Sequence, residues 1–300
     1  MYDPLGLASP VILEGKLILQ QLVVMGKKAN NNNPLGWDDP LLENMNQRWR
    51  CWRDALPKLE NVSIPRCYHR RGFGPVERRE IHAFSDASKE AIATAVYLRE
   101  VDGEGETSVS LLYGRSKIAP IYYSTSIPRL ELCGAVLATQ AVKMILKELD
   151  VKVDEEIYYS DSKVVLGYIR NKSRRFYVYV ANRVQTIRNA TDPYQWRYID
   201  TANNPADLAT RCMSPDKLME SRWLSGPEFL WNTLPQKILL NENDPEVKRE
   251  LVVCAMRSQT PQELGCSRFE RFSSWLSVKH AVANLIRLIR GFRRESTQRR

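Results

Sequence analysis

The sequence predicts an α/β fold in which a mixed five-stranded sheet is layered by helices, with mainly helical segments on either side. Three consecutive strand-like segments at residues 80–85, 92–100 and 109–116 predict an antiparallel meander. A glycine-containing turn at residues 102–105 joins the last two as a hairpin. Helical and strand-like segments alternate after the meander, which is typical of a mixed sheet covered by helices.

The segments before the sheet are predicted to be helical. Residues 10–26 carry apolar side chains at helical spacing, and a second helical stretch with tryptophans covers residues 39–56. An asparagine-rich turn at residues 30–36 separates them. The glycines of residues 72–75 lack the strand-to-helix context of a phosphate-binding loop, so we interpret that segment as a bend.

The segments after the meander complete the sheet. Pro128 suits the first turn of a long helix that ends near Leu149. The chain becomes irregular from Glu228 onward and ends in a basic amphipathic helix at residues 275–294. Between these segments we expect a strand at 157–160, helices at 162–170 and 177–189, a strand at 195–199 and a last helix after Pro205.

Composition indicates more about the protein's surroundings in the cell than about its activity. The chain has 300 residues and a formal net charge of +9, which suits a polyanionic partner but does not establish one. Its six cysteines are scattered without a CxxC pair, which favours a reducing compartment. No segment has the apolar length of a membrane span, and the amino terminus lacks a signal-peptide pattern. We therefore expect the cytoplasm and no membrane partner.

Four acidic residues are predicted at the ends of regular elements. Asp86 ends the first strand, Glu131 lies in the first turn of the long helix, Asp161 ends the fourth strand and Asp207 begins the last helix. The carboxyl ends of parallel strands and the amino ends of the following helices meet at one edge, where the four should converge. Converging carboxylates need cations, and two Mg²⁺ or Mn²⁺ ions would support phosphodiester hydrolysis. Taken singly, each acid is equally well explained as a solvated strand end or a helix cap.

Short motifs surround the four acids: Ser85-Asp86-Ala87-Ser88, Ile127-Pro128-Arg129-Leu130-Glu131-Leu132, Tyr159-Ser160-Asp161-Ser162 and Asn204-Pro205-Ala206-Asp207-Leu208-Ala209-Thr210-Arg211. In order and context these motifs resemble the ribonuclease H domains of retroelements. The second of them, together with Tyr2-Asp3-Pro4-Leu5-Gly6-Leu7, Val180-Ala181-Asn182-Arg183-Val184 and Trp223-Leu224-Ser225-Gly226-Pro227-Glu228-Phe229-Leu230, resembles the BEL/Pao family of retrotransposon polyproteins specifically. The resemblance covers nearly the whole chain, least specifically its tail.

The resemblance implies an enzyme, a ribonuclease H-type endonuclease that cuts the RNA strand of RNA–DNA hybrids during reverse transcription. Asp86, Glu131, Asp161 and Asp207 would be both catalytic and metal-binding, with two Mg²⁺ or Mn²⁺ ions as cofactors. The implied partners are the RNA–DNA hybrid and the reverse transcriptase and integrase regions of the same polyprotein. The implied location is the cytoplasm, including virus-like particles, with access to the nucleus.

The resemblance also predicts how the chain is divided. We expect the end of a reverse transcriptase-like region at 1–60, a linker at 61–79, the ribonuclease H-like domain at 80–215, a second linker at 216–267 and a basic helical tail at 268–300 that leads toward an absent integrase module. Neither neighbour is complete, because the chain has no Tyr-x-Asp-Asp motif and only three histidines without a CxxC. Many ribonucleases H carry a histidine shortly before the fourth acid; residues 197–202 contain none, which predicts modest turnover.

A basic and aromatic stretch beside the acids is the candidate substrate track. Cations would bind backbone phosphates, and aromatic rings would stack on bases or sugars. We expect roughly half of these residues to be structural instead. His82, on the same strand as Asp86, is expected to be a core residue or one that supports the site. The candidate nucleic-acid-binding residues are Ser88, Arg129, Lys163, Arg170, Lys172, Arg174, Arg175 and Arg183, interleaved with Tyr168, Phe176, Tyr177 and Tyr179.

Three alternatives compete with the nuclease. A catalytically silent ribonuclease H-like segment would only bind nucleic acid, and the four intact acids argue against it. An aspartic peptidase, which this polyprotein family also encodes, needs an Asp-Thr/Ser-Gly loop; Asp86-Ala87-Ser88 and Asp161-Ser162-Lys163 both lack the glycine. An integrase core requires a glutamate at a set distance after its second aspartate, where this chain has Trp196.

Overall fold

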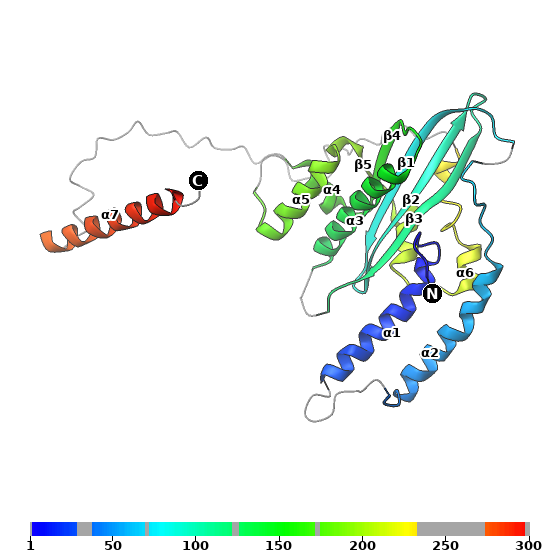
Figure 1. The fold of residues 1–300 in the computed structure, drawn as a ribbon, viewed down its shortest axis with the longest axis horizontal. Coiled ribbons are helices and arrows are strands. Elements are labelled where there is room, and N and C mark those ends of the chain that lie inside the picture. Colours follow the sequence, from blue (N-terminus) through cyan, green and yellow to red (C-terminus); the bar gives the residue numbers. More distant parts are fainter. Residues whose placement is uncertain are drawn as a thin grey trace. The chain divides into compact units, whose positions relative to one another are not determined.

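The computed structural model describes residues 2–28, 38–69, 72–121, 126–171, 175–232 and 274–297. Residues 1–239 form one compact unit, and residues 240–300 form another, whose described part is the helix α7 (Trp275–Thr297). The first unit contains one five-stranded sheet with the strand order β3-β2-β1-β4-β5 (Figure 1). None of the described helices combines the length and apolar character needed to span a membrane.

The sheet is mixed. β1 (Val76–Ala87) pairs antiparallel with β2 (Ala91–Asp102), which pairs antiparallel with β3 (Thr107–Ile118). On the other side, β4 (Glu155–Ser160) runs parallel to β1, and β5 (Trp196–Tyr198) runs parallel to β4. The predicted meander and the mixed five-stranded sheet are therefore confirmed. The three long strands extend past their predicted ends because their terminal residues are largely charged or polar and so lack the residue types that mark a strand.

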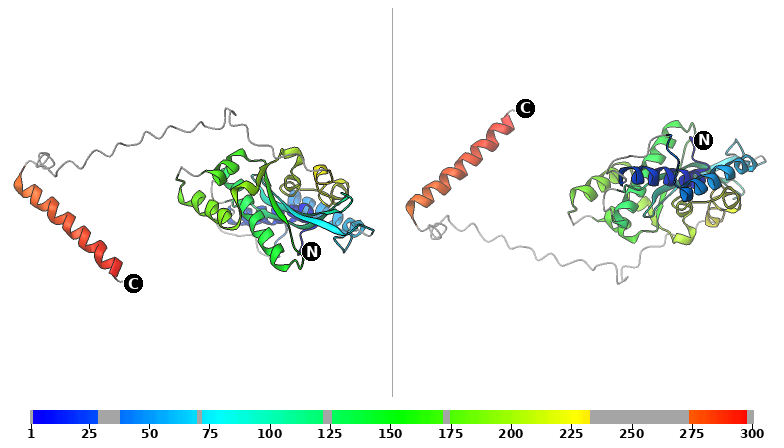
Figure 2. Two further views of the ribbon diagram at one scale, coloured as in Figure 1. Left: turned by 90° about the horizontal axis from the view of Figure 1, so that it is seen from above. Right: turned by 90° about the horizontal axis from the view of Figure 1, so that it is seen from below.

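Helices cover both faces of the sheet (Figures 1 and 2). Because successive side chains of a strand point to opposite faces, Ile81 and Ala83 of β1 contribute to one core and Phe84 to the other. The first core is completed by α3 (Ile127–Glu148), α4 (Lys163–Arg170) and α5 (Val178–Ala190). The second core is completed by α1 (Ser9–Lys28), by α6 (Pro215–Glu220) and by the short 3₁₀ helices η4 (Pro205–Ala209) and η5 (Glu228–Leu230).

The last helix predicted after Pro205 is in fact this 3₁₀ helix, η4, and α6 follows it separately. The Asn204 side chain accepts a hydrogen bond from the Ala206 backbone N–H and so begins η4. η4 ends at Ala209, before Thr210 turns back so that its hydroxyl contacts Asp86. The remaining 3₁₀ helices are η1 (Leu56–Asn61), η2 (Pro193–Gln195) and η3 (Thr201–Asn203), and α2 (Glu43–Ala55) lies between α1 and η1 in the chain.

The amino-terminal segment is part of the domain, which differs from the predicted boundary at residue 60. The Asp3 carboxylate accepts hydrogen bonds from the backbone N–H groups of Leu7 and Ala8, both at 2.9 Å, and leads the chain into α1. The Gly114 N–H of β3 donates to the Leu5 carbonyl at 2.8 Å. Farther along α1, the Lys16 ammonium donates to the Ser116 carbonyl at 2.9 Å, so this segment covers the β3 edge of the sheet.

The predicted linkers also contribute to the domain. β1 begins at Val76, inside the predicted linker 61–79. Trp223 and Leu230, inside the predicted linker 216–267, are fully buried in the second core. The Tyr97 hydroxyl donates to the Trp223 carbonyl at 2.7 Å, and the Arg99 Nε donates to the Leu230 carbonyl at 2.7 Å. The rest of that linker, from residue 233, lies outside the described residues.

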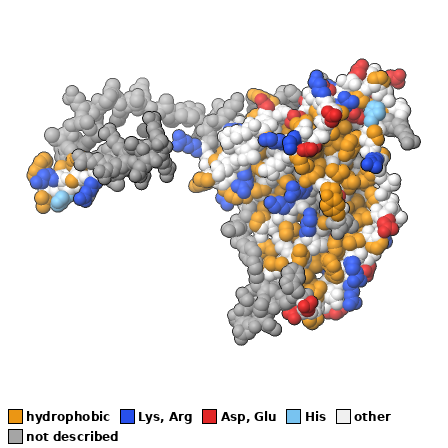
Figure 3. All heavy atoms as spheres, in the orientation of Figure 1, with side chains coloured by type: hydrophobic (Ala, Val, Ile, Leu, Met, Phe, Trp, Pro, Cys, Tyr) orange, Lys and Arg blue, Asp and Glu red, His pale blue; other side chains and the backbone are white. Residues whose placement is uncertain are grey.

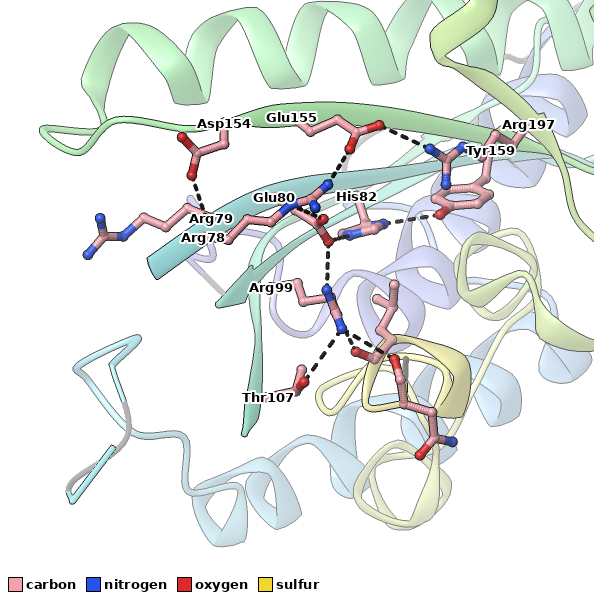
Figure 4. Close-up of polar contacts among 12 residues, drawn as sticks. Arg78, Arg79, Glu80, His82, Arg99, Thr107, Asp154, Glu155, Tyr159 and Arg197 are labelled. Atoms are coloured by element: carbon pink, nitrogen blue, oxygen red, sulfur yellow. Dashed lines mark hydrogen bonds and ion pairs between the residues drawn. The ribbon is translucent and has the colours of Figure 1, made fainter. Parts of the chain in front are cut away.

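A buried charge network ties β1 to its neighbouring strands (Figure 4). The Glu80 carboxylate is 1% exposed and contacts Arg78 at 2.7 Å, Arg99 at 2.8 Å and His82 at 3.1 Å. Burial acts to raise the pKa of Glu80, but the contacts with His82 and Arg99 outweigh it and lower the pKa to about 2. Burial lowers the pKa of His82, whose Nδ1 lies 3.1 Å from the Tyr159 hydroxyl. The expectation of a core histidine is confirmed.

Candidate functional site

The strand pairing places two of the predicted acids side by side. Asp86 is the second-last residue of β1, and Asp161 directly follows β4. β1 and β4 are parallel neighbours, with Ser85 of β1 opposite Ser160 of β4. Both acids therefore leave the same edge of the sheet. Asp86 is 7% exposed, and its Oδ2 accepts a hydrogen bond from the Thr210 hydroxyl at 2.8 Å.

The third acid, Glu131, reaches this edge because α3 packs very close to the end of β1. A Cβ atom at Gly134 would lie 2.8 Å from the Asp86 carbonyl oxygen, a distance that only a glycine permits. Glu131 lies nearly one helical turn before Gly134 on the same helix. The Ser162 hydroxyl donates to Glu131 Oε2 at 2.6 Å, which links α3 to the residue after Asp161.

The fourth acid, Asp207, comes from η4 on the other face of the sheet. Its Oδ1 forms an ion pair with the Arg211 guanidinium at 3.0 Å. Asp161 is also held from this side, because its Oδ2 accepts a hydrogen bond from the Thr201 hydroxyl of η3 at 2.8 Å. All four predicted acids thus gather at the carboxyl edge of β1 and β4, between α3 on one face and η3 and η4 on the other.

The electrostatics show that the acids act on one another. Burial and the charges of Asp161 and Asp207 raise the pKa of Asp86 to about 6, against the lowering effect of the Thr210 hydrogen bond. Burial raises the pKa of Glu131, and the charge of Asp161 adds to that rise. Burial raises the pKa of Asp207 too; Arg211 opposes the rise and Asp161 increases it. Asp161 is therefore within electrostatic reach of the other three acids.

The donor chemistry of the site fits a hard divalent cation, because carboxylate oxygens are the ligands that Mg²⁺ and Mn²⁺ prefer. Within the described ranges, no three His, Cys, Asp or Glu side chains are arranged to hold a single metal ion. Each acid instead has a partner within the fold: Ser162 donates to Glu131, Thr201 to Asp161, Thr210 to Asp86, and Arg211 pairs with Asp207. Each of these contacts involves one oxygen of its carboxylate, so an ion would bind through the other oxygen or through a remaining lone pair.

Two predicted nucleic-acid-binding residues meet on one aromatic ring beside the acids. The Arg183 guanidinium of α5 lies 3.5 Å from the Tyr179 ring centroid, and the Arg129 guanidinium of α3 lies 5.2 Å from it. Arg183 Nε also donates to the Cys133 sulfur at 3.1 Å. We call Arg129, Tyr179 and Arg183 the arginine–tyrosine cluster. Figure 3 shows Lys and Arg side chains over the part of this face where α3, α4 and α5 lie.

Other members of the predicted track have structural contacts. Arg170 donates to the Trp196 carbonyl at 2.7 Å, and the Ser88 hydroxyl closes the turn after β1 by accepting from the Ala91 N–H at 3.1 Å. The Lys163 ammonium lies 5.6 Å from the Tyr198 ring centroid. Arg175 is exposed, and Lys172 and Arg174 lie outside the described residues. Contact of any of these residues with nucleic acid stays a prediction.

The residues that orient the acids were not singled out from the sequence. Ser162 follows Asp161 directly, and Thr210 and Arg211 follow Asp207 within the same motif. Their place inside the motifs was the available signal, although it did not show which acid each would contact. Thr201 lies outside the motifs, and its hydrogen bond to Asp161 spans 40 positions of the chain. Only the folded arrangement identifies it.

Comparison with solved structures finds ribonucleases H. Ribonuclease H1 of the halophilic archaeon Halobacterium salinarum is 13% identical over 43% of this chain and 90% of that chain, with a TM-score of 0.29. The amino-terminal RNase H domain of a Mycobacterium tuberculosis protein is 12% identical over 48% of this chain and 96% of its own, with a TM-score of 0.29. LC11-RNase H1, solved in complex with RNA/DNA hybrid, is 15% identical over 43% and 91%, with a TM-score of 0.30.

Comparison with curated proteins finds no match. Comparison with protein families matches residues 1–162 to the family described as Pao retrotransposon-like RNaseH-like domain. The match covers more than half of the chain, and it includes the amino-terminal segment that packs on the β3 edge. It also includes three of the four acids, Asp86, Glu131 and Asp161. The chain therefore belongs to the Pao retrotransposon-like RNaseH-like domain family.

Proposed function

We propose that this domain is a metal-dependent endonuclease that cuts the RNA strand of RNA–DNA hybrids during reverse transcription. The observation that carries the proposal is the convergence of four acids from separate elements, with the charge of Asp161 raising the pKa of the other three. Acids kept together at such an electrostatic cost are typical of functional sites. A catalytically silent scaffold has no need of that arrangement.

The chain's own residues would hold the ions and order the site. Asp86, Glu131, Asp161 and Asp207 would bind two Mg²⁺ or Mn²⁺ ions, which supply an activated water and stabilise the leaving oxygen of an in-line displacement. Ion binding offsets the mutual repulsion of the acids, which disfavours their ionised forms in its absence. The Thr210 hydroxyl contacts one carboxylate oxygen of Asp86 and leaves the second oxygen for a ligand.

Nucleic acid would be held by the arginine–tyrosine cluster. Its two guanidinium groups share one ring although their charges repel each other, so a phosphate near them would relieve that repulsion. Arg129 and Glu131 both lie near the start of α3, so the cluster and this acid are carried by the same end of one helix. The partners would be the hybrid and the reverse transcriptase and integrase regions of one polyprotein, in the cytoplasm or a virus-like particle.

The test is a cleavage and binding assay on hybrid, duplex RNA and duplex DNA, with and without Mg²⁺. Wild type should cut only the RNA of the hybrid, and only with Mg²⁺. Asp161→Asn should lower the rate by at least about a hundredfold, because it removes a metal ligand, and should still bind the hybrid. Arg183→Ala, in contrast, should bind the hybrid more weakly, and its affinity should depend less on salt.

Equal cutting of duplex DNA, or an Asp161→Asn protein with full activity, would show that the proposal is wrong. A folded wild-type protein that binds the hybrid without cutting it at any Mg²⁺ or Mn²⁺ concentration would identify the domain as a silent nucleic-acid-binding segment.

A further inference from the structure

A pocket of about 250 Å³ opens beside Asp207, on the side of the acids away from α3. One wall is the loop that carries η3 and η4, and the other is the chain from the end of α6 to Pro227. A pocket of this volume excludes a duplex and limits the ligand to a single unit of a strand. Its lining includes Thr201, Ala202, Asn203, Asp207, Glu220 and Arg222.

The pocket is continuous with the acid cluster. Asp207 lines it directly, and Thr201, which also lines it, donates a hydrogen bond to Asp161 at 2.8 Å. The arginine–tyrosine cluster lies on the opposite face of β1, because α3 and α5 complete the first core while η4 completes the second. A strand that contacts that cluster and crosses the acids would run toward the pocket on the far side.

The lining suits one nucleotide. The Arg222 guanidinium is exposed and donates to the Ala202 carbonyl at 3.1 Å through a single Nη2, so its fork retains further donors for an anion. Asn203 and Glu220 offer an amide and a carboxylate that can pair with the edge of a base. Pro205, Leu208 and Pro227 provide an apolar surface for a sugar or ring face.

We propose that this pocket binds one unpaired nucleotide of the strand that crosses the acids, with its phosphate on Arg222. The proposal rests on the proposed function for its biological meaning, because it concerns the substrate of the same site. The binding itself does not depend on cleavage. Binding of a single nucleotide to the pocket requires neither metal nor activity.

The experiment is an NMR titration of the metal-free full chain with adenosine 5′-monophosphate, and separately with adenosine and with inorganic phosphate. We expect the mononucleotide to shift the backbone resonances of Ala202 and Asn203, with roughly tenfold weaker binding in Arg222→Ala, the loss expected for one charge-assisted hydrogen bond. Ala202→Trp should abolish binding by filling the pocket from its exposed wall. Lys217→Ala, which removes an exposed cation from α6 outside the pocket, is the matched control and should bind as wild type does.

A second arm links the pocket to polymeric substrate. A hybrid with one bulged ribonucleotide should bind wild type and Asp161→Asn more tightly than a fully paired hybrid, and this preference should disappear in Arg222→Ala. Equal mononucleotide affinity in wild type and Ala202→Trp would overturn the proposal, as would identical resonance shifts with inorganic phosphate alone. If the domain is a nuclease, Asp161→Asn should cut too slowly to disturb this measurement; if it is not, wild type serves equally well.

Discussion

At the scale of single residues, the site is defined by how its acids are held. Asp86 is almost completely buried, and the Thr210 hydroxyl and a backbone N–H are the groups among the described residues that stabilise its charge. Its pKa of about 6 means that the metal-free protein carries an unfavourable negative charge at neutral pH. Keeping this acid lowers the stability of the metal-free protein, a cost that a bound cation would offset.

We therefore expect Asp86→Asn to stabilise the metal-free protein. The raised pKa means that Asp86 disfavours folding above pH 6, and that this penalty fades as the pH falls through 6 toward the ordinary value of 3.8. In urea unfolding with chelator, the variant should gain at most about 3 kcal/mol at pH 8 and almost nothing near pH 3.5. Glu60→Gln, a change at an exposed acid on η1, is the control. A gain that did not depend on pH would contradict the assigned pKa.

At the scale of elements, the approach of α3 to β1 determines whether Glu131 joins the site. The helix begins with proline in its first turn and buries its apolar face against the sheet. Gly134 allows its backbone to lie against the Asp86 peptide. The sequence pattern predicted the helix, but the closeness of the contact depends on the absence of one side chain at one position.

Gly134→Ala should push α3 away from β1 and displace Glu131. Overpacking against backbone atoms should destabilise the protein by roughly 1–3 kcal/mol. Cleavage should fall further than the loss of folded protein explains, because Glu131 moves with the helix. Gly167→Ala is the matched control: this glycine lies in α4 with no atom within 4 Å of an added Cβ. That variant should be more stable by roughly 0.5–1 kcal/mol, with unchanged activity. Equal stability changes in the two variants would show that the close contact at Gly134 does not limit the packing of α3.

At the scale of the whole molecule, segments from both sides of the predicted domain complete it. The amino-terminal segment and the chain around Trp223 meet, because the Trp223 indole N–H donates to the Leu7 carbonyl at 2.8 Å. Gly6 makes this docking possible: its φ is +72°, and a Cβ there would lie 1.6 Å from the Gly114 carbonyl oxygen. Residues 1–28 therefore lie within the compact unit that contains the sheet.

Gly6→Ala should consequently destabilise the whole domain. Gly105→Ala is the control, since its φ of +83° carries the same backbone strain with no atom within 4 Å of an added Cβ. Both variants should lose roughly 1–2 kcal/mol from that strain. Gly6→Ala should lose at least about 2 kcal/mol more, because the clash separates the segment from β3. Thermal unfolding of both variants measures the difference, and equal losses would mean that the docking does not contribute to stability.

The sequence by itself determined the order and type of the main elements and the four acids at their ends. Strand-like segments and a glycine-containing hairpin turn marked β1 to β3, and helical spacing marked α3, because these patterns depend on neighbours a few positions away. The acids were found through short motifs, and parallel pairing of β1 with β4 made the convergence of Asp86 and Asp161 predictable.

Only the tertiary structure decided which segments complete the core and which side chains hold the acids. Trp223 lies in a turn and Leu230 in the short 3₁₀ helix η5, where no periodicity signals burial, so a linker was expected there. The contact of Thr201 with Asp161 and the meeting of Arg129 and Arg183 on Tyr179 join residues far apart in the chain. Such contacts depend on strand register and helix packing, which arise from all the burial interactions together and leave no local pattern in the sequence.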